Sequence, residues 1–511
     1  MSDLVHDLIF RAARRMPAAE ALAYGGQRLD YAALADAVRT AAAGFLGLGL
    51  GKRERVAVYL EKRIETVSAL FGAAAAGGVF VPVNPLLKAE QVAHILADCN
   101  VRVLVTSPER LRLLAPVLGA CPDLRSIVVT GALDGLQAPA GVTLVAWSAL
   151  PSTEATAPAH GTIDIDMAAI LYTSGSTGKP KGVVLSHRNI VAGAHSVAGY
   201  LGLAPEDRVL SVLPLSFDYG LSQLTTAFHV GAAVVLMNHL FARDIPKAVG
   251  QEDITVLAAV PPLWLQLAPL EWPAHRLRIL TNSGGSMPRT TTEALRRALP
   301  DAQLFLMYGL TEAFRSTYLP PAELARRPDS IGRAIPNAEV LVVRPDGSEC
   351  DADEPGELVH RGALVALGYW NDAARTAERF RPAPGQNPAL PLLEMAVWSG
   401  DTVRRDADGF LYFIGRFDEM IKVSGYRISP SEIEDVLYAS GLVTEAVAFG
   451  VPHPALGQAI VVVAVGGDDI TPALIIKHCQ QRLPAYMVPS HVEVRAEALP
   501  RNPNGKIDRK L

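Results

Sequence analysis

Residues 172–182 read Tyr-Thr-Ser-Gly-Ser-Thr-Gly-Lys-Pro-Lys-Gly, a stretch with five hydroxyl-bearing residues, three glycines and two lysines. Apolar runs at 167–171 and 183–185 flank it, which predicts a loop between two strands. Glycine lets a backbone approach a ligand closely, while hydroxyls, backbone N–H groups and lysines suit the oxygens of a polyphosphate. The residues that we expect to bind phosphate are Thr173, Ser174, Gly175, Ser176, Thr177, Gly178, Lys179 and Lys181.

This loop differs from a Walker A motif. That motif needs four residues between its glycines and a Ser or Thr after its lysine. Here Gly175 and Gly178 are three positions apart, and Pro180 follows Lys179 and argues against a helix beginning there. On composition alone a flexible linker is the alternative, since Ser, Gly and Lys are common in linkers. The apolar flanks favour a functional loop.

The whole string resembles the signature of the AMP-forming adenylating enzymes, which comprise acyl-CoA synthetases, amino-acid adenylation domains and luciferases. Six further segments resemble that family's motifs in the family's order, so the resemblance spans essentially the whole chain. They are Asn282-Ser-Gly-Gly-Ser286, Tyr308-Gly-Leu-Thr-Glu312, Ser399-Gly-Asp401, Gly415-Arg-Phe-Asp418, Lys422-Val-Ser-Gly-Tyr-Arg427 and Asn504-Gly-Lys506.

Composition points to a cytosolic enzyme. The chain has 511 residues, enough for more than one domain, with 47 basic and 52 acidic side chains. That near balance gives no reason to expect nucleic acid or an anionic membrane as a partner. We expect no signal peptide, and the longest apolar run, 68–83, is too short and interrupted to span a bilayer. Four scattered cysteines match neither a metal site nor a disulfide framework.

The alternation of helical and strand patterns predicts an α/β fold with a large N-terminal domain of mixed, largely parallel sheets. We expect strands at 55–60, 78–83, 101–106, 126–130 and 143–146, and helices at 31–46 and 64–76. A proline-rich segment, 381–391, reads as irregular. After it we expect a small α+β domain with helices at 429–440 and 472–482 and strands at 446–451 and 460–465. We divide the chain into residues 1–417 and 418–511. The resemblance implies a mobile C-terminal domain with its hinge at Asp418.

The resemblance also implies the first half-reaction, in which Mg-ATP converts a carboxylic acid into an acyl-adenylate. Lys506 is the implied catalytic cation, although a solvated side chain is the simpler interpretation of a lysine so near the C-terminus. Glu312 is the implied Mg²⁺ ligand, since Mg²⁺ on ATP phosphates takes one or two protein carboxylates. Thr311 is the implied donor to the α-phosphate.

Adenine and ribose contacts follow from the same motifs. Tyr308 offers a ring face to adenine, although an ordinary half-buried aromatic is the alternative. Asp401 suits the ribose hydroxyls, with a turn aspartate as its alternative, and Arg416 is a second ribose or phosphate contact or else a solvated arginine. The loop residues implied around the nucleotide are Gly284, Gly285, Ser286 and Gly309.

The second half-reaction transfers the acyl group to a thiol. The segment 422–427 resembles the one that enters the active site after domain rotation, and Gly425 could wall a narrow pantetheine tunnel. A simple turn glycine is the alternative. We expect no carrier domain after Lys506, and therefore expect the thiol of CoA or of a carrier phosphopantetheine to come in trans. The implied channel residues are Lys422, Ser424, Gly425 and Tyr426.

The acid itself is ambiguous. Phe217 stands where many acyl-CoA synthetases carry histidine. Asp218 falls where amino-acid-activating members pair an aspartate with the substrate ammonium, although a loop aspartate or helix cap is the alternative. Arg315 could bind an acidic substrate tail or form a structural ion pair. Segments 283–287, 313–318 and 368–371 most resemble the acyl-CoA ligases associated with exosortase A systems, a name that does not imply a substrate.

We therefore expect an AMP-forming acyl-CoA synthetase. The alternative is a stand-alone amino-acid adenylating enzyme that loads a carrier protein. A non-catalytic nucleotide-binding protein would be expected to lose Lys506 or Glu312, and both are present. No motif excludes a luciferase-like oxygenase, but its need for a rare substrate disfavours it.

Overall fold

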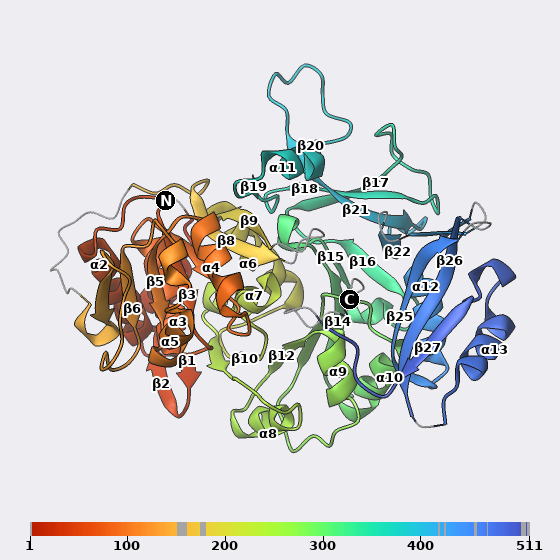
Figure 1. Ribbon diagram of the computed structural model, residues 1–511, viewed down its shortest axis with the longest axis horizontal. Helices are drawn as coiled ribbons and strands as arrows, with labels where there is room; N and C mark the ends of the chain where they lie inside the picture. The colour runs from red at the N-terminus through yellow and green to blue at the C-terminus, as the bar shows by residue number, and fades with distance from the viewer. Residues whose placement is uncertain are drawn as a thin grey trace.

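The computed structural model describes residues 3–150, 161–173, 180–416, 420–423, 426–453, 457–467, 469–501 and 507, without the side chains of 422, 426, 427, 457 and 486. It has two large sheets in the N-terminal part and a smaller sheet near the C-terminus (Figure 1). The predicted α/β class is confirmed. No described helix has the length and apolar character needed to cross a membrane.

The first sheet has eight strands in the order β19-β9-β8-β4-β3-β5-β6-β7, parallel from β8 to β7. Alternate residues of β3 enter different apolar clusters, with Val56 and Val58 facing α2 and α3 while Ala57 and Tyr59 face α4 and α5. This two-sided burial explains why the strands are almost entirely apolar. The strands are β3 (Arg55–Tyr59), β4 (Val79–Pro82), β5 (Val101–Thr106), β6 (Ser126–Val129), β7 (Thr143–Ala146), β8 (Met167–Thr173), β9 (Lys181–Ser186) and β19 (Gly368–Tyr369).

The helices of this region are close to those predicted. Asp30 caps α2 by accepting from the backbone N–H of Ala33 at 2.7 Å. Gly72 lets α3 approach α2, because a Cβ there would lie 2.6 Å from the Cβ of Ala41. The helices are α2 (Tyr31–Gly47), α3 (Ile64–Ala75), α4 (Ala89–Asp98) and α5 (Pro108–Leu114), with short 3₁₀ turns η1 (Leu118–Ala120) and η2 (Trp147–Ala149).

The second sheet has fourteen strands. It is parallel from β1 through β11, β10, β12 and β13 to β14, and antiparallel beyond β14. Its strands are β1 (Glu20–Tyr24), β2 (Gln27–Asp30), β10 (Arg208–Ser211), β11 (Ala233–Leu236), β12 (Val256–Ala259), β13 (Ile279–Asn282), β14 (Gln303–Tyr308), β15 (Thr317–Leu319), β16 (Ser330–Ala334), β17 (Ala338–Val343), β18 (Gly356–Gly362), β20 (Phe380–Pro382), β21 (Met395–Arg405) and β22 (Leu411–Arg416).

The parallel strands place three segments at one edge. Residues 212–217 follow β10, residues 283–286 follow β13 and residues 309–315 follow β14, so all three leave the sheet at its carboxyl edge. The other elements here are α1 (Asp7–Arg15), α6 (His187–Leu201), α7 (Asp218–Val230), α8 (Asp244–Gln251), α9 (Pro261–Leu267), α10 (Arg289–Ala298), α11 (Ala373–Arg379), η3 (Thr311–Ala313) and η4 (Pro321–Glu323).

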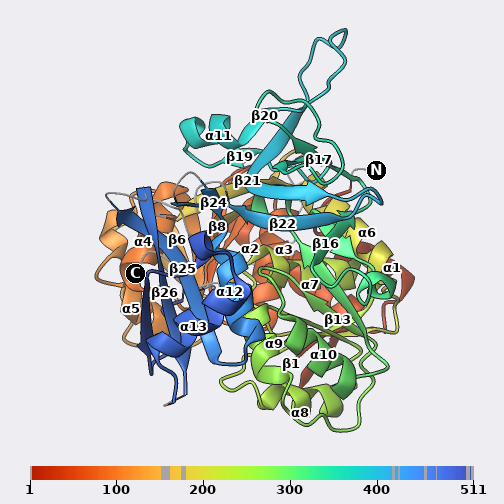
Figure 2. The ribbon, with the colours of Figure 1, turned by 90° about the vertical axis from the view of Figure 1, so that its right-hand side faces the viewer.

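The proline-rich segment is irregular only in part. Its first residues, Arg381 and Pro382, belong to β20 and pair with β21, which corrects the prediction of a wholly irregular stretch. Beyond them the chain projects from the body of the protein in both views (Figures 1 and 2). Leu390, Leu392 and Leu393 on this projection are exposed.

The five-stranded sheet near the C-terminus has its own apolar core. Both predicted helices and both predicted strands are confirmed, with the strands longer than expected. The predicted boundary between residues 417 and 418 lies outside the described residues. The elements are β23 (Ile421–Val423), β24 (Tyr426–Ile428), α12 (Pro430–Ala439), β25 (Val443–His453), β26 (Gly457–Gly466), α13 (Pro472–Arg482), η5 (Ala485–Met487) and β27 (His491–Arg495).

Candidate active site

The opening motif lies between two strands, as predicted. Antiparallel β8 and β9 flank it, and Thr173 pairs with Lys181 across the ladder. The Oγ1 of Thr173 is buried and bonds to no described residue. Ser174, Gly175, Ser176, Thr177, Gly178 and Lys179 lie outside the described residues.

Lys181 and Glu312 form a half-buried ion pair, although they are 131 residues apart in the chain. The ammonium of Lys181 donates at 2.8 Å both to Oε1 of Glu312 and to the hydroxyl of Tyr369, which itself donates to Oε1 at 2.6 Å. Burial raises the pKa of Glu312, but Lys181 and Tyr369 outweigh it and hold that pKa below its ordinary value. Glu312 is therefore a carboxylate that stays ionised.

A strained turn lies between Glu312 and Arg315. Phe314 has φ of +55°, a rare conformation for a bulky residue and one that is typical of functional turns. Its ring is buried against Gly193 of α6, where a Cβ would lie 2.5 Å from Cδ1 of Phe314. This packing holds the turn that separates Thr311 and Glu312 from Arg315.

Tyr308, Asp401 and Arg416 meet, as their predicted roles at one nucleoside require. The Tyr308 hydroxyl donates to Asp401, and Arg416 lies 3.1 Å from Oδ1 of Asp401, its neighbour across the β21–β22 ladder. Burial raises the pKa of Tyr308 well above its ordinary value, and the Asp401 carboxylate raises it further. The phenol therefore stays a hydrogen-bond donor.

The glycine loop after β13 packs against Phe217 and Pro261. Gly284 has φ of +87°, and a Cβ there would lie 3.6 Å from the ring of Phe217. The amide of Asn282 donates to the carbonyl of Gly285 at 3.3 Å. Gly309 lies close to Arg315, since a Cβ on it would be 3.2 Å from the Cα of Arg315. Ser286 belongs to the same described loop.

Asp218 and Arg315 are ion-pair partners, which agrees with the structural ion pair given as one interpretation of Arg315; that Asp218 is its partner was not predicted. Oδ2 of Asp218 lies 2.7 Å from Nη1 of Arg315, and the two side chains are only 4% and 2% exposed. Nη1 also donates to the carbonyl of Phe314 at 2.9 Å. On its other side Asp218 lies 3.5 Å from the Thr311 hydroxyl. Thr311 is thus next to Glu312 in the chain and next to Asp218 in space.

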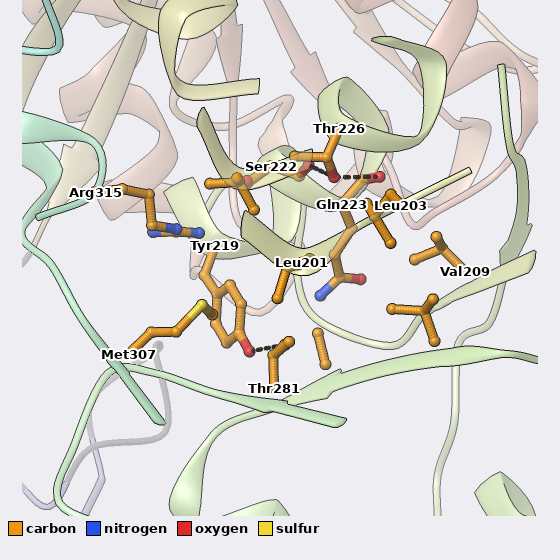
Figure 3. Close-up of a pocket in the computed structure, with 13 residues that line it drawn as sticks. Leu201, Leu203, Val209, Tyr219, Ser222, Gln223, Thr226, Thr281, Met307 and Arg315 are labelled. Carbon is orange, nitrogen blue, oxygen red and sulfur yellow. Dashed lines mark hydrogen bonds between the residues drawn. The ribbon is translucent and has the colours of Figure 1, made fainter. Parts of the chain in front are cut away.

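Sequence reasoning missed three residues here. Tyr369 was noted only within a subgroup resemblance, and its hydroxyl role has no local signal. Gln223 lies one helical turn beyond Tyr219 on α7 and lines a cavity beside Arg315 (Figure 3). Lys62 is buried and donates to the carbonyl of Val212 at 2.8 Å, and burial lowers its pKa to about 8. It supports the segment that leads to Phe217.

The structure describes only some of the residues predicted to act in the C-terminal part. Lys506, Asp418, Ser424 and Gly425 lie outside the described residues, and only the backbones of Lys422 and Tyr426 are described, in β23 and β24. Arg501 and Ile507, which flank the segment with Lys506, pair as an antiparallel bridge.

Comparison with known proteins gives consistent matches along the chain. Residues 9–370 match the family model described as AMP-binding enzyme, and residues 432–506 match the AMP-binding enzyme C-terminal domain. The L-proline–[L-prolyl-carrier protein] ligase of Pseudomonas fluorescens is 32% identical over 99% of this chain and 98% of its own length. Tyrocidine synthase 3 of Brevibacillus parabrevis is 30% identical over 99% of this chain, which spans only 8% of that longer protein.

Solved structures match at similar coverage. An anthranilate CoA ligase in complex with anthranoyl-AMP superposes with a TM-score of 0.87 at 25% identity, covering 99% of this chain and 96% of that one. An o-succinylbenzoate CoA synthetase from Bacillus subtilis, in complex with ATP and magnesium, superposes with a TM-score of 0.83 at 25% identity. That match covers 99% of this chain and 98% of the other.

Proposed function

The chain belongs to the AMP-binding enzyme family, and we propose that it is an AMP-forming acid–thiol ligase whose acid carries no amine. The observation that carries this proposal is the pair of charged clusters around residues 311–315. One cluster, Lys181 with Glu312, suits a phosphate and its metal, while the other, Asp218 with Arg315, lines the acid side.

The proposed reaction has two displacements. A carboxylate oxygen of the acid attacks the α-phosphorus of ATP, the bond to the β-phosphate oxygen breaks and pyrophosphate leaves. A thiol sulfur then attacks the acyl carbon, the bond to the AMP oxygen breaks, AMP leaves and the thiol proton passes to solvent. The first displacement moves negative charge around phosphorus, so fixed cations and donors there lower its barrier.

The described residues fit Mg-ATP. Glu312 offers an ionised carboxylate, the kind of ligand that Mg²⁺ takes alongside phosphate oxygens, and the buried Oγ1 of Thr173 is a donor at the edge of the glycine-rich loop. Bound Mg²⁺ would neutralise charge on the phosphates. Lys181 orients Glu312, Thr311 is the donor proposed for the α-phosphate, and Tyr308, Asp401 and Arg416 form the proposed adenosine contacts.

The Asp218–Arg315 pair supports an acid without an amine at this position. The guanidinium already supplies the positive charge that a substrate ammonium would bring to Asp218. A third buried charge would be uncompensated unless this pair separated, and separation of a buried pair is costly. The similarity to the anthranilate and o-succinylbenzoate CoA ligases supports CoA as the acceptor.

A specific observation favours a second candidate, an amino-acid ligase that loads a carrier phosphopantetheine. The full-length relative at 32% identity is named as such a ligase, for L-proline. In that case Asp218 would exchange Arg315 for the substrate ammonium. The resemblance to exosortase-associated ligases remains a proposal, and it favours neither class of acid. A cytoplasmic location also remains a proposal.

Acid-dependent exchange of labelled pyrophosphate into ATP tests the proposal. The panel should contain fatty, aryl, dicarboxylic and amino acids, and the variants Asp218→Asn and Asp218→Asn/Arg315→Met. If Asp218 only neutralises Arg315, an amine-free acid wins, and the double variant still selects amine-free acids, although loss of Arg315 can lower its rate with them. If an amino acid wins and both variants lose it, the carrier-loading candidate is correct. If no acid in the panel supported exchange, both candidate functions would be contradicted.

The C-terminal assignments are proposals about the two half-reactions. We propose that residues 418–511 rotate about Asp418, that Lys506 acts in adenylation, and that the segment 422–426 lines the thiol channel. Lys506→Ala should abolish adenylation but spare thiolation of a supplied acyl-adenylate, and Gly425→Leu should do the reverse. Single-turnover assays of each half-reaction measure this. Equal loss of both half-reactions in both variants would contradict the rotation.

A further inference from the structure

A small cavity lies beside Arg315. It is enclosed by α6, α7 and the central strands, and Figure 3 shows its lining. Most of the wall is aliphatic, with Leu201, Val209 and Val256 among its members. Its volume is about 20 Å³, room for roughly one water-sized group.

Two side chains in this wall have unmet hydrogen-bonding capacity. The amide nitrogen and oxygen of Gln223 are both buried without a described partner, and so are Nε and Nη2 of Arg315. Gln223 is 5% exposed and Arg315 is 2% exposed. Both residues line the same cavity. Buried polar groups without partners are rare and call for an explanation, such as a ligand or an ordered water.

The other polar groups in the wall differ, because their bonds are internal. The hydroxyl of Tyr219 lies 2.5 Å from Oγ1 of Thr281, and the hydroxyl of Thr226 donates to the carbonyl of Ser222 at 2.6 Å. Among the lining residues, Gln223 and Arg315 are the two with buried side-chain atoms that lack a described partner.

Charge limits what that guest can be. Asp218 already neutralises Arg315 at 2.7 Å. A second carboxylate in the cavity would therefore be a buried charge without a full counter-charge, which is costly. A neutral oxygen can accept from Nε or Nη2 of Arg315 without that cost, and the Gln223 amide can both donate and accept.

On this basis we propose that the acid substrate has a short apolar body whose far end carries an uncharged hydrogen-bonding group, a hydroxyl, carbonyl or primary amide, held by Gln223 and Arg315. The proposal rests on the acid–thiol ligase function and names its substrate class. It excludes the acidic tail that was one sequence-based interpretation of Arg315. Arg315 binds both groups: Nη1 donates to Asp218, and its remaining N–H groups donate to the substrate tail.

The test is pyrophosphate exchange with matched series of short carboxylic acids that differ only in the terminal group: methyl, hydroxyl, carboxamide or carboxylate. Wild type should prefer hydroxyl or carboxamide over methyl by about 100-fold or more in kcat/KM, because a buried polar site strongly rejects an analogue that leaves its groups unpaired. The carboxylate series should be the poorest.

Gln223→Met is the informative variant, since it keeps volume and removes the amide. It should cut the preference for polar over methyl tails at least about tenfold, while the methyl acid keeps or gains activity. Its unfolding temperature should stay at or above that of wild type, because no partner is left unpaired. Thr226→Val is the matched control on the same helix face and should leave the tail preference unchanged.

The outcomes separate the two levels of inference. Exchange with some acid, but with a methyl tail preferred or with the preference unaltered in Gln223→Met, would overturn the tail assignment and leave the ligase function intact. The same result would show that Gln223 and Arg315 hold only a water molecule. If no acid in any series supported exchange, the ligase function itself would be overturned.

Discussion

Two ion pairs lie on either side of Phe314, and they differ in burial and in partners. In the first, Lys181 and Glu312 are 20% and 12% exposed, and Tyr369 bonds to both. In the second, Arg315 and Asp218 are almost fully buried, and Arg315 also bonds to the Phe314 carbonyl. Glu312 and Arg315 are only three positions apart in the chain.

The difference indicates what each pair can do. The Lys181–Glu312 pair keeps some exposure to solvent, and a carboxylate that meets a metal and phosphates must be accessible to them. A buried pair is costly to break, because each charge would be left without compensation. The first pair thus suits the chemistry common to the family, and the second suits the shape and polarity of one particular acid pocket.

The largest expected effect is on stability at the buried pair. Asp218→Asn should lower the free energy of unfolding by about 3–5 kcal/mol, because it leaves the Arg315 charge buried and unpaired. Asp218→Asn/Arg315→Met should recover most of that loss. Urea unfolding of the three proteins measures this, and a double variant no more stable than the single one would contradict a simple charge-pair role.

Next is catalysis at the Lys181–Glu312 pair. Glu312→Gln should lower pyrophosphate exchange by about 10²–10³-fold, as loss of a group that stabilises transition-state charge commonly does. It should lower the free energy of unfolding by about 1–3 kcal/mol, less than Asp218→Asn, because the partly buried Lys181 ammonium loses its counter-charge. A Mg²⁺ titration of exchange and urea unfolding check the two parts. Near-wild-type exchange with an unchanged Mg²⁺ requirement would show that Glu312 is no metal ligand.

A smaller effect is the pH dependence of stability that a buried histidine introduces. His360 is fully buried, bonds through Nδ1 to the hydroxyl of Ser316 at 2.9 Å, and has its pKa lowered by burial to about 4. The unfolded chain binds this proton near pH 6.5 and the folded one near pH 4, so stability falls as pH drops through that window. Between pH 7.5 and 5 the loss is about 2 kcal/mol.

His360→Gln removes that titration. Its free energy of unfolding should fall less than that of wild type between pH 7.5 and 5, whatever its value at pH 7.5. Urea unfolding at both pH values measures the difference. An identical pH dependence in the two proteins would show that His360 titrates normally.

The smallest effect is at Tyr369. Tyr369→Phe keeps the ring, whose centroid lies 4.3 Å from the Lys181 ammonium, but removes the hydroxyl bonded to Glu312. One such bond contributes about 1 kcal/mol, so exchange should fall about fivefold to tenfold with a raised Mg²⁺ requirement. Phe380→Leu, which alters a ring packed on Tyr369 without touching Glu312, is the control. A similar fall in both variants would make the effect one of packing.

Sequence reasoning succeeded where the physics is local. The strands of the first sheet and the helices and strands near the C-terminus are apolar runs with clear periods, and their positions were predicted to within a few residues. The motifs also predicted that Tyr308 and Asp401 share one site, and the two side chains are hydrogen-bonded, while their roles and that of Glu312 stay predictions. The same reasoning treated Asp218 and Arg315 as independent and missed Gln223, because their significance depends on what lies across the cavity.

By itself the sequence determined the α/β class, the family and the residues proposed to contact Mg-ATP, since backbone conformation and motif chemistry are encoded over a few consecutive positions. Only the tertiary structure decided that Arg315 neutralises Asp218 and that Gln223 and Arg315 line the same largely aliphatic cavity. Those relations join residues up to 97 positions apart. Their energies arise from the exclusion of water, which no short stretch of sequence can specify because it requires packed walls from several elements at once.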